Sequence, residues 1–339
     1  MANTIPTLKE IAERLNLSIS TVSRALHHHP SIGLRTSMRV QQLANELNYE
    51  PNSAAIYFKQ KRTSLVGVIV PRLSQEFFAS IVNGIEDIAY KHKYTVVLCQ
   101  SRDEEEREIQ LVEAMKSNRV DGLLVSISKK TKNYAHFESL KKYNIPVVFF
   151  DRIPDMPDIH FIACQLKSGI EEAISFLSGR KHQSIALING PENLLASQER
   201  LEGYKLALKT HKIKFDPSRI ASSDLSKEGT EQAMKKLLSS KKKPTAIIAF
   251  NDYVAMDAIQ FARKSNIRMN KDLCFVSFAN EAITNYLEHP PIASIEQFPY
   301  QQGEKAMEIL LQLMEKKNDE PSISVIHNIL IQSQLVIHD

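Results

Sequence analysis

From Leu65 onward, the chain alternates short, continuous apolar runs with longer stretches of helical periodicity. The apolar runs lie at residues 65–70, 95–99, 122–126 and 146–150, and they resume at 184–188, 245–249 and 274–278. Polar residues do not alternate within these runs, so both faces of each predicted strand must be buried, as in a parallel sheet covered by helices. The interruption between the two sets predicts two α/β units with a cleft between them. Ligands of such sheets bind outside the carboxyl ends of the strands.

The first 50 residues follow a different pattern, which predicts three short helices. Thr7 and Glu10 form a capping box at the start of the first helix. Asn16 stands where the chain must turn sharply, and asparagine tolerates the left-handed conformation. Ser18 can cap a second helix that runs to Leu26. A third helix is predicted from apolar residues at helical spacing, which are Val40, Leu43, Ala44 and Leu47.

The second helix has two different faces. Its apolar face predicts burial of Val22, Ala25 and Leu26. Its other face presents Ile19, Ser20, Ser23 and Arg24. A small, polar face with one arginine fits the major groove of DNA, so we interpret this helix as a recognition helix. The alternative is an ordinary helical hairpin whose exposed face has no function.

The charge distribution favours DNA binding by the same segment. Residues 1–62 contain eight Lys and Arg and four Glu, whereas residues 63–339 contain 35 basic and 35 acidic residues. The whole net charge of +4 therefore lies in the first fifth of the chain, where contacts to phosphates need it. The run His27, His28 and His29 could suggest a metal site, but consecutive residues do not converge easily on one ion. We interpret it as a solvated loop.

Composition and motifs exclude several other classes of protein. At 339 residues the chain predicts two or three compact units, and no apolar run approaches the roughly 20 residues of a membrane span. The charged Lys9 and Glu10 interrupt any signal-peptide core, and the three cysteines, at 99, 164 and 274, have no ligand spacing, so a reduced cytoplasmic protein is expected. There is no phosphate loop, His-Glu-x-x-His helix or Gly-x-Ser-x-Gly elbow. We therefore expect no enzyme activity, cofactor or metal.

Three N-terminal motifs carry a family resemblance. Thr-Leu-Lys-Glu-Ile-Ala at 7–12, Ser-Ile-Ser-Thr-Val-Ser-Arg-Ala-Leu at 18–26 and Leu-Asn-Tyr-Glu-Pro-Asn at 47–52 resemble the helix-turn-helix headpiece of the lactose-repressor/galactose-repressor (LacI/GalR) family of bacterial transcription regulators. By position, the resemblance implies base contacts from Ile19, Ser20 and Arg24. It implies phosphate contacts from Thr7, Thr21, Ser23, Thr36 and Tyr49. It also implies a hinge helix that enters the minor groove, with Asn52 as its N-cap and with Ala55 and Phe58 at the DNA.

The hinge departs from the usual family pattern at two positions. Phe58 stands where the family usually has a leucine that wedges between base pairs, and Ile56 stands where an arginine is common. Phenylalanine is itself a known minor-groove wedge, so the kinking mechanism is retained in this interpretation. The alternative for Phe58 is a linker residue packed against the larger domain.

Later motifs extend the resemblance over the rest of the chain. They lie at 197–203, 250–255 and 290–297. The fold implied is an N-terminal all-α headpiece followed by an α/β effector domain of two doubly wound parallel-sheet subdomains, similar to periplasmic binding proteins. The expected domains are a DNA-binding domain at 1–50, a hinge and linker at 51–62 and an effector and dimerisation domain at 63–339. Crossings between subdomains are expected near 163–166, 290–294 and 322–326, which gives one subdomain of 63–163 with 293–323 and another of 164–292 with 324–339.

The resemblance also indicates candidate effector contacts in the cleft. Arg200 and Asn251 match family ligand contacts and suit hydroxyls or a carboxylate. Phe77 and Phe78 could stack on a sugar or base, and Asn280 completes the predicted set. Each has a structural alternative: Phe78 as a core residue, Arg200 as an ion-pair partner, and the residue after Asn251, Asp252, as the cap of the following helix.

Several acidic and basic residues common in the family are replaced here. Ala279 stands in place of a carboxylate that often binds sugar hydroxyls, Gln198 in place of an arginine and Gln165 in place of an aspartate. Because the cleft keeps one arginine and lacks one of the usual acidic residues, we expect it to bind neutral or anionic ligands. A carbohydrate or sugar acid is therefore the leading effector class.

We expect a homodimeric repressor of a catabolic operon, in which each headpiece reads half of a near-palindromic operator. An effector in the cleft would lower operator affinity. The alternative is a regulator controlled by a partner protein, such as a phosphocarrier, rather than by a sugar. A plain solute-binding protein would not need the headpiece.

Overall fold

The computed structural model describes residues 6–50, 62–240, 242–315 and 326–338. The chain divides into two compact units, Met1–Thr63 and Ser64–Asp339.

The N-terminal unit contains three helices in its described part, with Thr7 and Ser18 as N-caps as predicted, although the Glu10 side chain does not complete the predicted capping box among the described residues. The helices are α1 (Leu8–Leu15), α2 (Ile19–Leu26) and α3 (Leu34–Glu46). The amide of Glu10 donates to the Thr7 hydroxyl at 3.2 Å, while the Glu10 carboxylate accepts from Arg14 at 2.6 Å. Asn16 takes the left-handed conformation with φ 55° in the turn, and the Ser18 hydroxyl accepts from the amide of Thr21 at 3.1 Å.

A small apolar core holds these three helices together. Its buried residues come from all three helices and are Ile11, Ala12, Val22, Ala25, Val40 and Ala44. Leu43 and Leu47 pack at its edge. The predicted apolar faces of the three helices are therefore confirmed.

The C-terminal unit is built on two six-stranded sheets. In the first, the strand order is β11-β5-β4-β3-β1-β2, and all of its paired strands are parallel. Its strands are β1 (Leu65–Val70), β2 (Thr95–Gln100), β3 (Gly122–Val125), β4 (Val147–Phe150), β5 (His160–Gln165) and β11 (Asn328–Gln332). The second sheet has the order β12-β10-β9-β8-β6-β7, with only β12 antiparallel to its neighbour. Its strands are β6 (Ile185–Asn189), β7 (Ile220–Ser222), β8 (Ala246–Ala249), β9 (Cys274–Ala279), β10 (Ala293–Glu296) and β12 (Gln334–Ile337).

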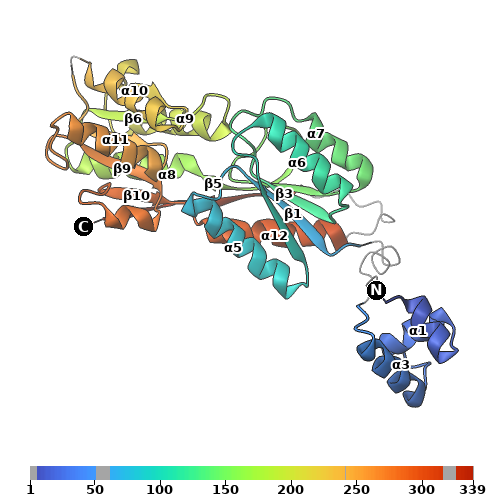
Figure 1. Ribbon diagram of the computed structural model, residues 1–339. Coiled ribbons are helices and arrows are strands. Elements are labelled where there is room, and N and C mark those ends of the chain that lie inside the picture. Colours follow the sequence, from blue (N-terminus) through green and yellow to red (C-terminus); the bar gives the residue numbers. More distant parts are fainter. Residues whose placement is uncertain (1–5, 51–61, 241, 316–325, 339) are drawn as a thin grey trace. The chain divides into compact units, whose positions relative to one another are not determined.

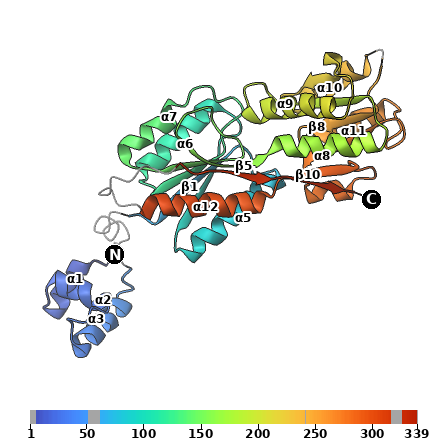
Figure 2. The same ribbon diagram turned by 180° about the vertical axis from the view of Figure 1, so that it is seen from behind.

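Helices cover both faces of each sheet (Figures 1 and 2). The helices of the first subdomain are α5 (Glu76–Lys91), α6 (Glu105–Ser117), α7 (Ala135–Ser139) and α12 (Pro299–Glu315). Those of the second are α8 (Leu166–Gly179), α9 (Leu195–Thr210), α10 (Lys227–Leu238) and α11 (Asp252–Lys264). Short 3₁₀ turns lie at Leu140–Tyr143, Pro217–Arg219 and Ala282–Tyr286. On β1, Val66 and Val68 pack with α5 and α12, whereas Ile69 packs with α6, so both faces of this strand are buried as predicted.

Helices α5 and α12 approach each other especially closely, and two glycines make this possible. A Cβ on Gly303 of α12 would lie 2.0 Å from the carbonyl oxygen of Ile81, and one on Gly84 of α5 would lie 2.2 Å from that of Tyr300. No side chain fits at either position without moving the helices apart.

The chain crosses between the two subdomains three times, and two of the expected crossings are wrong. The first crossing follows β5, at Gln165, within the expected range. The second was expected near 290–294, but β10 pairs with β9 and buries Ala293 and Ile295 in the second subdomain, so the chain crosses after Glu296. The third was expected near 322–326, but β11 pairs with β5 of the first sheet, so the crossing lies at Ser333. The expected boundaries at 292/293 and 323/324 are therefore corrected to positions after Glu296 and at Ser333.

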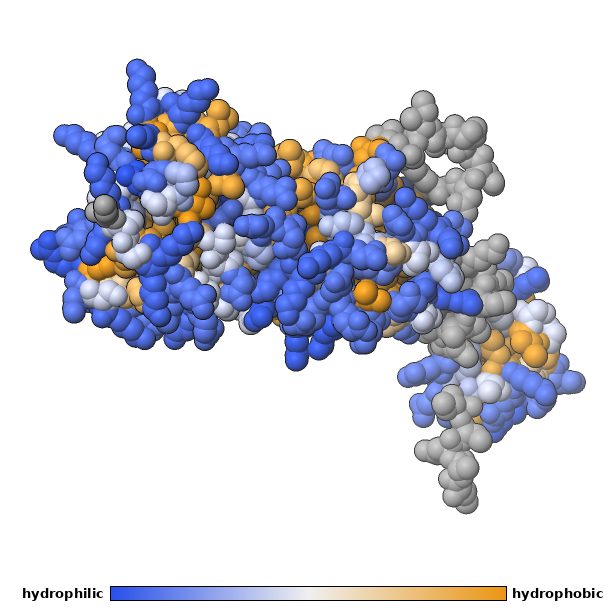
Figure 3. All heavy atoms as spheres, turned by 90° about the horizontal axis from the view of Figure 1, so that it is seen from above, coloured by the Kyte–Doolittle hydropathy of each residue, from blue (hydrophilic) through white to orange (hydrophobic). Residues whose placement is uncertain are grey.

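The face shown in Figure 3 is mostly hydrophilic, with apolar patches between the polar residues. No helix in the described part of the chain has the length and apolar character needed to cross a membrane.

Candidate nucleic-acid interface and ligand cleft

The outward face of α2 has the composition of a DNA-reading surface. Ile19 is 50 % exposed, and Ser20 and Arg24 are also exposed, whereas Thr21 and Ser23 are half-buried. The Ser18 hydroxyl lies 2.8 Å from the hydroxyls of both Ser20 and Thr21, so the start of the helix presents a cluster of hydroxyl groups. Such groups, together with a free guanidinium, can contact base edges and phosphates.

The predicted phosphate contacts lie near helix ends. Thr7 is exposed and caps α1, and Thr36 lies in the first turn of α3, where its amide donates to Gly33 at 3.0 Å. Tyr49 is half-buried against the core, and its amide donates to Ala44 at 2.8 Å. Helix N-termini favour phosphate because their amides point outward and the helix dipole is positive there.

The basic residues of this unit differ in their pairing. Lys9 and Arg14 form i,i+4 ion pairs within α1. Arg24, Arg35 and Arg39 have no acidic partner within 4.0 Å among the described residues, which leaves three cations for phosphates or bases. The predicted contacts Asn52, Ala55 and Phe58 lie outside the described residues.

The histidine run has the contacts of a solvated loop. All three imidazoles are exposed, and His27, His28 and His29 lie within hydrogen-bond distance of Ser23, Gln41 and Ser31, respectively. No group of three or more metal-ligating side chains is present in the part of the chain that the structure describes.

In the C-terminal unit, a cavity of about 130 Å³ lies between the two sheets, at the carboxyl ends of their strands. Its lining comes from both subdomains and includes Gln75, Phe77, Phe78, Asp151, Arg152, Phe161, Cys164, Glu199, Arg200, Phe250, Asn251, Glu281 and Gln297. This is the position in which doubly wound sheets bind ligands. The structure thus brings together Phe77, Phe78, Arg200 and Asn251, four of the five predicted effector contacts.

Phe77 and Phe78 are at once core residues and part of the cavity wall. Both are buried, and their rings pack edge to face with centroids 5.5 Å apart. The two interpretations of Phe78, core residue or ligand contact, therefore do not exclude each other.

Arg200 is buried in the cavity wall without an ion-pair partner. Only 3 % of it is exposed, and its guanidinium lies 4.1 Å and 4.3 Å from the ring centres of Phe250 and Phe278. One terminal nitrogen donates to the carbonyl of Ala196 at 3.2 Å, while Nε has no partner in the described structure. Burial lowers the pKa of Arg200 to about 10, which leaves it protonated at neutral pH. The alternative role as a structural ion-pair partner is not what the geometry shows, because no carboxylate lies within 4.0 Å in the described part of the chain.

Asn251, rather than Asp252, caps α11. The Asn251 side chain accepts from the amide of Val254 at 2.9 Å, and it also lines the cavity. Asp252, expected as the cap, is instead fully buried. It accepts from the hydroxyl of Ser277 and, at 2.7 Å, from the amide of Glu281. Burial raises the pKa of Asp252 to about 6.

Glu281 is a cavity residue that sequence reasoning missed. Ala279 and Asn280 both have positive φ, 98° and 58°, and this turn after β9 brings Glu281 to the cavity. Glu281 is 6 % exposed; its Oε1 accepts from the amide of Phe77 at 3.1 Å, while Oε2 has no partner in the described structure. Burial raises the pKa of Glu281 to about 7, against the effect of the Phe77 amide.

Asn280 does not join the other predicted effector contacts. Its side-chain amide donates to Glu296 at 2.9 Å, and it lines a hollow beside α12 that adjoins the cavity through Phe77, Ala279 and Glu281, rather than the cavity itself. The same turn that carries Glu281 inward directs Asn280 elsewhere.

The structure also corrects the expectation that acidic groups are lost from the cleft. Ala279 indeed lines the cavity, and Gln165 and Gln198 are exposed outside its lining. However, Asp151, Glu199 and Glu281 bring three carboxyl groups to the lining. Burial raises the pKa of each of them. The only other cation of the lining, Arg152, is held by Asp103 at 2.6 Å.

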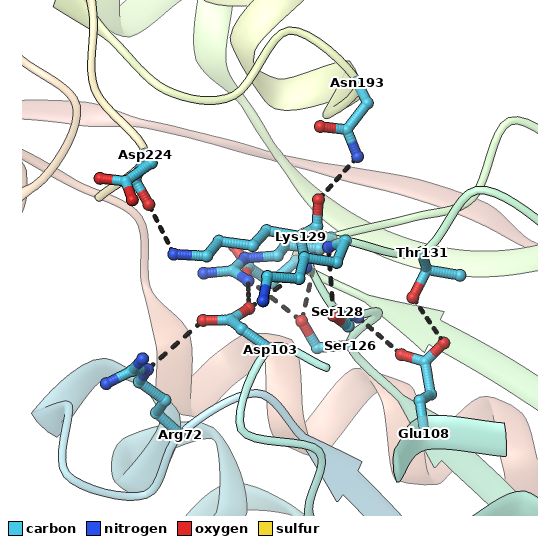
Figure 4. A network of polar contacts seen from close by, with 12 residues as sticks. Arg72, Asp103, Glu108, Ser126, Ser128, Lys129, Thr131, Asn193 and Asp224 are labelled. Carbon is cyan, nitrogen blue, oxygen red and sulfur yellow. Dashed lines mark hydrogen bonds and ion pairs between the residues drawn. The ribbon is translucent and has the colours of Figure 1, made fainter. Parts of the chain in front are cut away.

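A polar network joins the two subdomains at one side of the cleft (Figure 4). The Lys129 ammonium, from the first subdomain, donates to the Asp224 carbonyl of the second at 2.5 Å. The Asn193 amide returns a hydrogen bond to the Lys129 carbonyl at 2.7 Å. The Lys129 amide donates to Asp103, which also pairs with Arg152 of the cavity lining. We call Lys129, Asn193 and Asp224 the Lys129 clasp.

One buried carboxylate accepts hydrogen bonds from the loop that contains Lys129. Glu108 of α6 is fully buried and accepts from the amide of Ser128 at 2.6 Å and from the hydroxyl of Thr131 at 2.8 Å. His136 lies 3.1 Å from the same carboxylate. On another side of the cleft, the Tyr253 hydroxyl donates to the carbonyl of Ser74 at 3.1 Å. Hydrogen bonds therefore link the subdomains at several separate places.

Comparison with known proteins agrees with both units. Residues 7–52 match the family described as bacterial regulatory proteins, lacI family, and residues 63–338 match periplasmic binding proteins and the sugar-binding domain of the LacI family. The catabolite control protein A of Priestia megaterium is 30% identical over 318 residues, which cover 94% of this chain and 95% of that protein. The transcriptional repressor PurR of Aliivibrio fischeri (strain MJ11) is 30% identical over 316 residues, covering 93% of each chain. The lac repressor dimer, solved with operator and the anti-inducer ONPF, superimposes with a TM-score of 0.83 at 25% identity over 98% of both chains.

Proposed function

This chain belongs to the LacI family of bacterial regulatory proteins, and from that membership we propose that it represses a carbohydrate-catabolism operon until a small molecule binds its cleft. It is a DNA-binding transcription regulator with an effector domain, as its relatives are. The observation that carries the proposal is the exposed face of α2, in which Arg24 has no acidic partner among the described residues.

In this proposal α2 enters the major groove, where Ile19, Ser20 and Arg24 reach base edges. Phosphates are contacted from helix ends by Thr7, Thr21, Ser23, Thr36 and Tyr49. The segment 52–58 binds the minor groove, with Asn52 and Ala55 at the DNA and Phe58 as the wedge. Two chains form a dimer, so that two headpieces read the two halves of a near-palindromic operator.

The effector acts by changing the relative stability of two arrangements of the subdomains. A molecule in the cleft touches residues from both sheets, so it favours the arrangement in which both sets of contacts form. The family's effectors include sugars, as in the complex of the regulator CelR with cellobiose. Coupling between the effector and operator sites is typically about 1–3 kcal/mol, or 5- to 150-fold in affinity.

The proposal assigns regulation rather than catalysis, and it places the protein in the cytoplasm, where the chromosome is. A partner protein as the signal, the alternative expectation, gains no support from a cavity that offers buried polar groups to a small molecule. Phe77, Phe78, Arg200 and Asn251 are the effector contacts that we carry forward.

The test is footprinting of the purified protein on genomic fragments from its own host, with and without candidate sugars. We expect a protected near-palindrome that is lost when one sugar is added. Protection without any sequence preference would overturn the assignment as a specific regulator.

A further inference from the structure

Among the residues that the structure describes, two buried polar atoms of the cleft lining have no hydrogen-bond partner, and they belong to residues of opposite charge. They are Nε of Arg200 and Oε2 of Glu281, and both residues line the same cavity and are more than nine-tenths buried. A buried donor and a buried acceptor without partners are unfavourable, so native proteins nearly always satisfy such atoms. A ligand that accepts from Arg200 and donates to Glu281 would satisfy both.

The charges of the lining indicate the chemical class of that ligand. Three carboxyl groups, from Asp151, Glu199 and Glu281, face two guanidinium groups. Arg152 is already paired with Asp103, which leaves Arg200 as the cation available to a ligand. Burial raises the pKa of each of the three carboxyl groups, so this cavity disfavours further negative charge. These carboxyl groups would repel an anionic ligand, whereas hydroxyl or ammonium groups of a ligand would donate hydrogen bonds to them.

The two oxygens of the Glu281 carboxyl group differ in their hydrogen bonding. Oε1 accepts from the amide of Phe77, which belongs to the first subdomain, while Glu281 itself belongs to the second. A donor on the ligand that binds Oε2 would therefore contact the group that links the two subdomains. The rings of Phe77, Phe78 and Phe250 supply apolar surface in the same cavity, which suits the C–H faces of a sugar ring.

We propose that Glu281 is a specificity-determining effector contact, which accepts a hydrogen bond at Oε2 from a neutral or amino sugar whose oxygen accepts from Arg200. This inference rests on the proposed function of the cleft as an effector site. It replaces the sequence-based expectation of a neutral or anionic ligand with a ligand rich in donors, and it disfavours sugar acids and sugar phosphates.

The experiment is calorimetric titration of the full-length protein with a matched panel. The panel contains ribose, glucose, galactose and mannose, and for each hexose the 2-amino sugar, the uronic acid and the 6-phosphate. Each is titrated into the wild type and into the variants Glu281→Ala and Glu281→Gln. The control is Glu288→Gln, which removes an exposed acid from the same loop, where it pairs with Arg263 away from the cavity.

We expect a neutral or amino sugar to bind, and Glu281→Ala to weaken it at least 10-fold while Glu288→Gln leaves it unchanged. For an amino sugar, Glu281→Gln should lose as much affinity as Glu281→Ala, whereas for a neutral sugar it should lose less, because the amide oxygen still accepts. The proposal would be overturned if a uronic acid or a sugar phosphate bound more tightly than the neutral and amino sugars. It would also be overturned if Glu281→Ala bound the sugar as tightly as the wild type, or if no compound of the panel bound. If Glu281→Ala does not fold, the Gln variant decides.

Operator binding measured on the same samples distinguishes a failure of the role of Glu281 from a failure of the proposed function. Intact operator recognition with none of the expected sugar responses rejects the role of Glu281 alone. Loss of sequence-specific DNA binding in the wild type rejects the proposed function itself.

Discussion

Glu281 and Phe77 lie 204 residues apart in sequence and are joined by a hydrogen bond of 3.1 Å from the Phe77 amide to the Glu281 carboxyl group. This bond connects the turn after β9 to the first turn of α5, and so connects one subdomain to the other inside the cleft. The Lys129 clasp makes a second connection of this kind from different elements. These polar contacts between the subdomains are made by identifiable residues, which can be tested one at a time.

Arg24→Ala should remove most of the sequence preference of the headpiece. A good contact of an arginine to a base is worth about 1–3 kcal/mol of discrimination, so specific binding should fall roughly 5- to 150-fold and non-specific binding much less. The measurement is a competition gel shift with operator and scrambled DNA. The matched control, Arg263→Ala, removes an exposed arginine of α11 and should change neither affinity.

Operator affinity should fall steeply with salt, because the cations of the headpiece displace condensed counterions from DNA. Each phosphate neutralised adds about 0.9 to the slope of log K against log salt concentration. Titrations between 50 and 200 mM salt measure the slope, and Arg35→Ala should reduce it by about one unit if that arginine contacts a phosphate. A flat salt response would contradict the assignment of the headpiece.

Lys129→Met should weaken effector binding by opening the clasp. The substitution keeps the apolar stem and removes the ammonium that donates to Asp224. Because Lys129 is only half-buried, we expect a loss of about 1 kcal/mol, roughly 5-fold in affinity. Lys130→Met is the control, since Lys130 pairs with Glu104 of its own subdomain at an exposed site. Equal effects of the two substitutions would show that the clasp has no specific role.

Gly303→Ala should destabilise the effector domain, because the new methyl group would collide with the carbonyl of Ile81. Overpacking of this kind typically costs about 1–3 kcal/mol, which thermal unfolding would detect. Gly179→Ala at the end of α8 is the control: a Cβ there meets no atom within 4 Å. It should be neutral or slightly stabilising, since alanine favours helix more than glycine does.

Glu281→Gln should stabilise the protein at pH 8 but not at pH 5. The pKa of Glu281 is raised to about 7 in the folded state, so the folded protein binds this proton more tightly than the unfolded chain does. The penalty of the buried charge is therefore absent at low pH and appears as the pH rises from about 4.5 through 7. The expected gain at pH 8 is on the order of 1–3 kcal/mol in the free energy of unfolding.

Other charges near Glu281 must be considered in that experiment. The Asp252 carboxylate accepts a hydrogen bond from the Glu281 amide, and Asp252 and Glu76 raise the pKa of Glu281 further. Burial and, after it, the Glu281 charge raise the pKa of Tyr253. Arg200 lines the same cavity. Asp252, with a pKa of about 6, contributes to the wild-type pH dependence in the same direction and interacts with Glu281, so the difference between the two proteins reports Glu281 together with its effect on Asp252. Parallel pH profiles of wild type and variant would contradict the prediction.

The periodicity of the sequence predicted much of the fold. All seven continuous apolar runs became strands, because a strand buried on both faces must be apolar throughout. Strands β7, β11 and β12 were not predicted because they lie at sheet edges, where burial on two faces is not required and polar residues are accepted. Strands β5 and β10 lie inside their sheets and were also not predicted, because polar residues flank or interrupt their short apolar runs. The second and third crossings were misplaced because they depend on how β10, β11 and β12 pair.

The cleft was predicted less completely than the sheets. Arg200 and Asn251 could be identified from local motifs, because helix and strand ends fix their positions. The position of Glu281 depends on the left-handed turn at Ala279 and Asn280, and neither residue signals positive φ as clearly as glycine would. The side chain therefore reaches the cavity through a backbone conformation that a motif comparison does not reveal.

The order of strands in the first sheet has a consequence for biosynthesis. Strand β11 completes that sheet beside β5, although β6 to β10 of the second sheet lie between them in the sequence. Helix α12, which covers the first sheet, also follows β10. During translation the headpiece and most of the second sheet are therefore made before the first sheet can be completed. A nascent chain stalled before residue 299 would carry a DNA-binding headpiece while α5 lacks its helical partner, so a truncated product should remain susceptible to proteases.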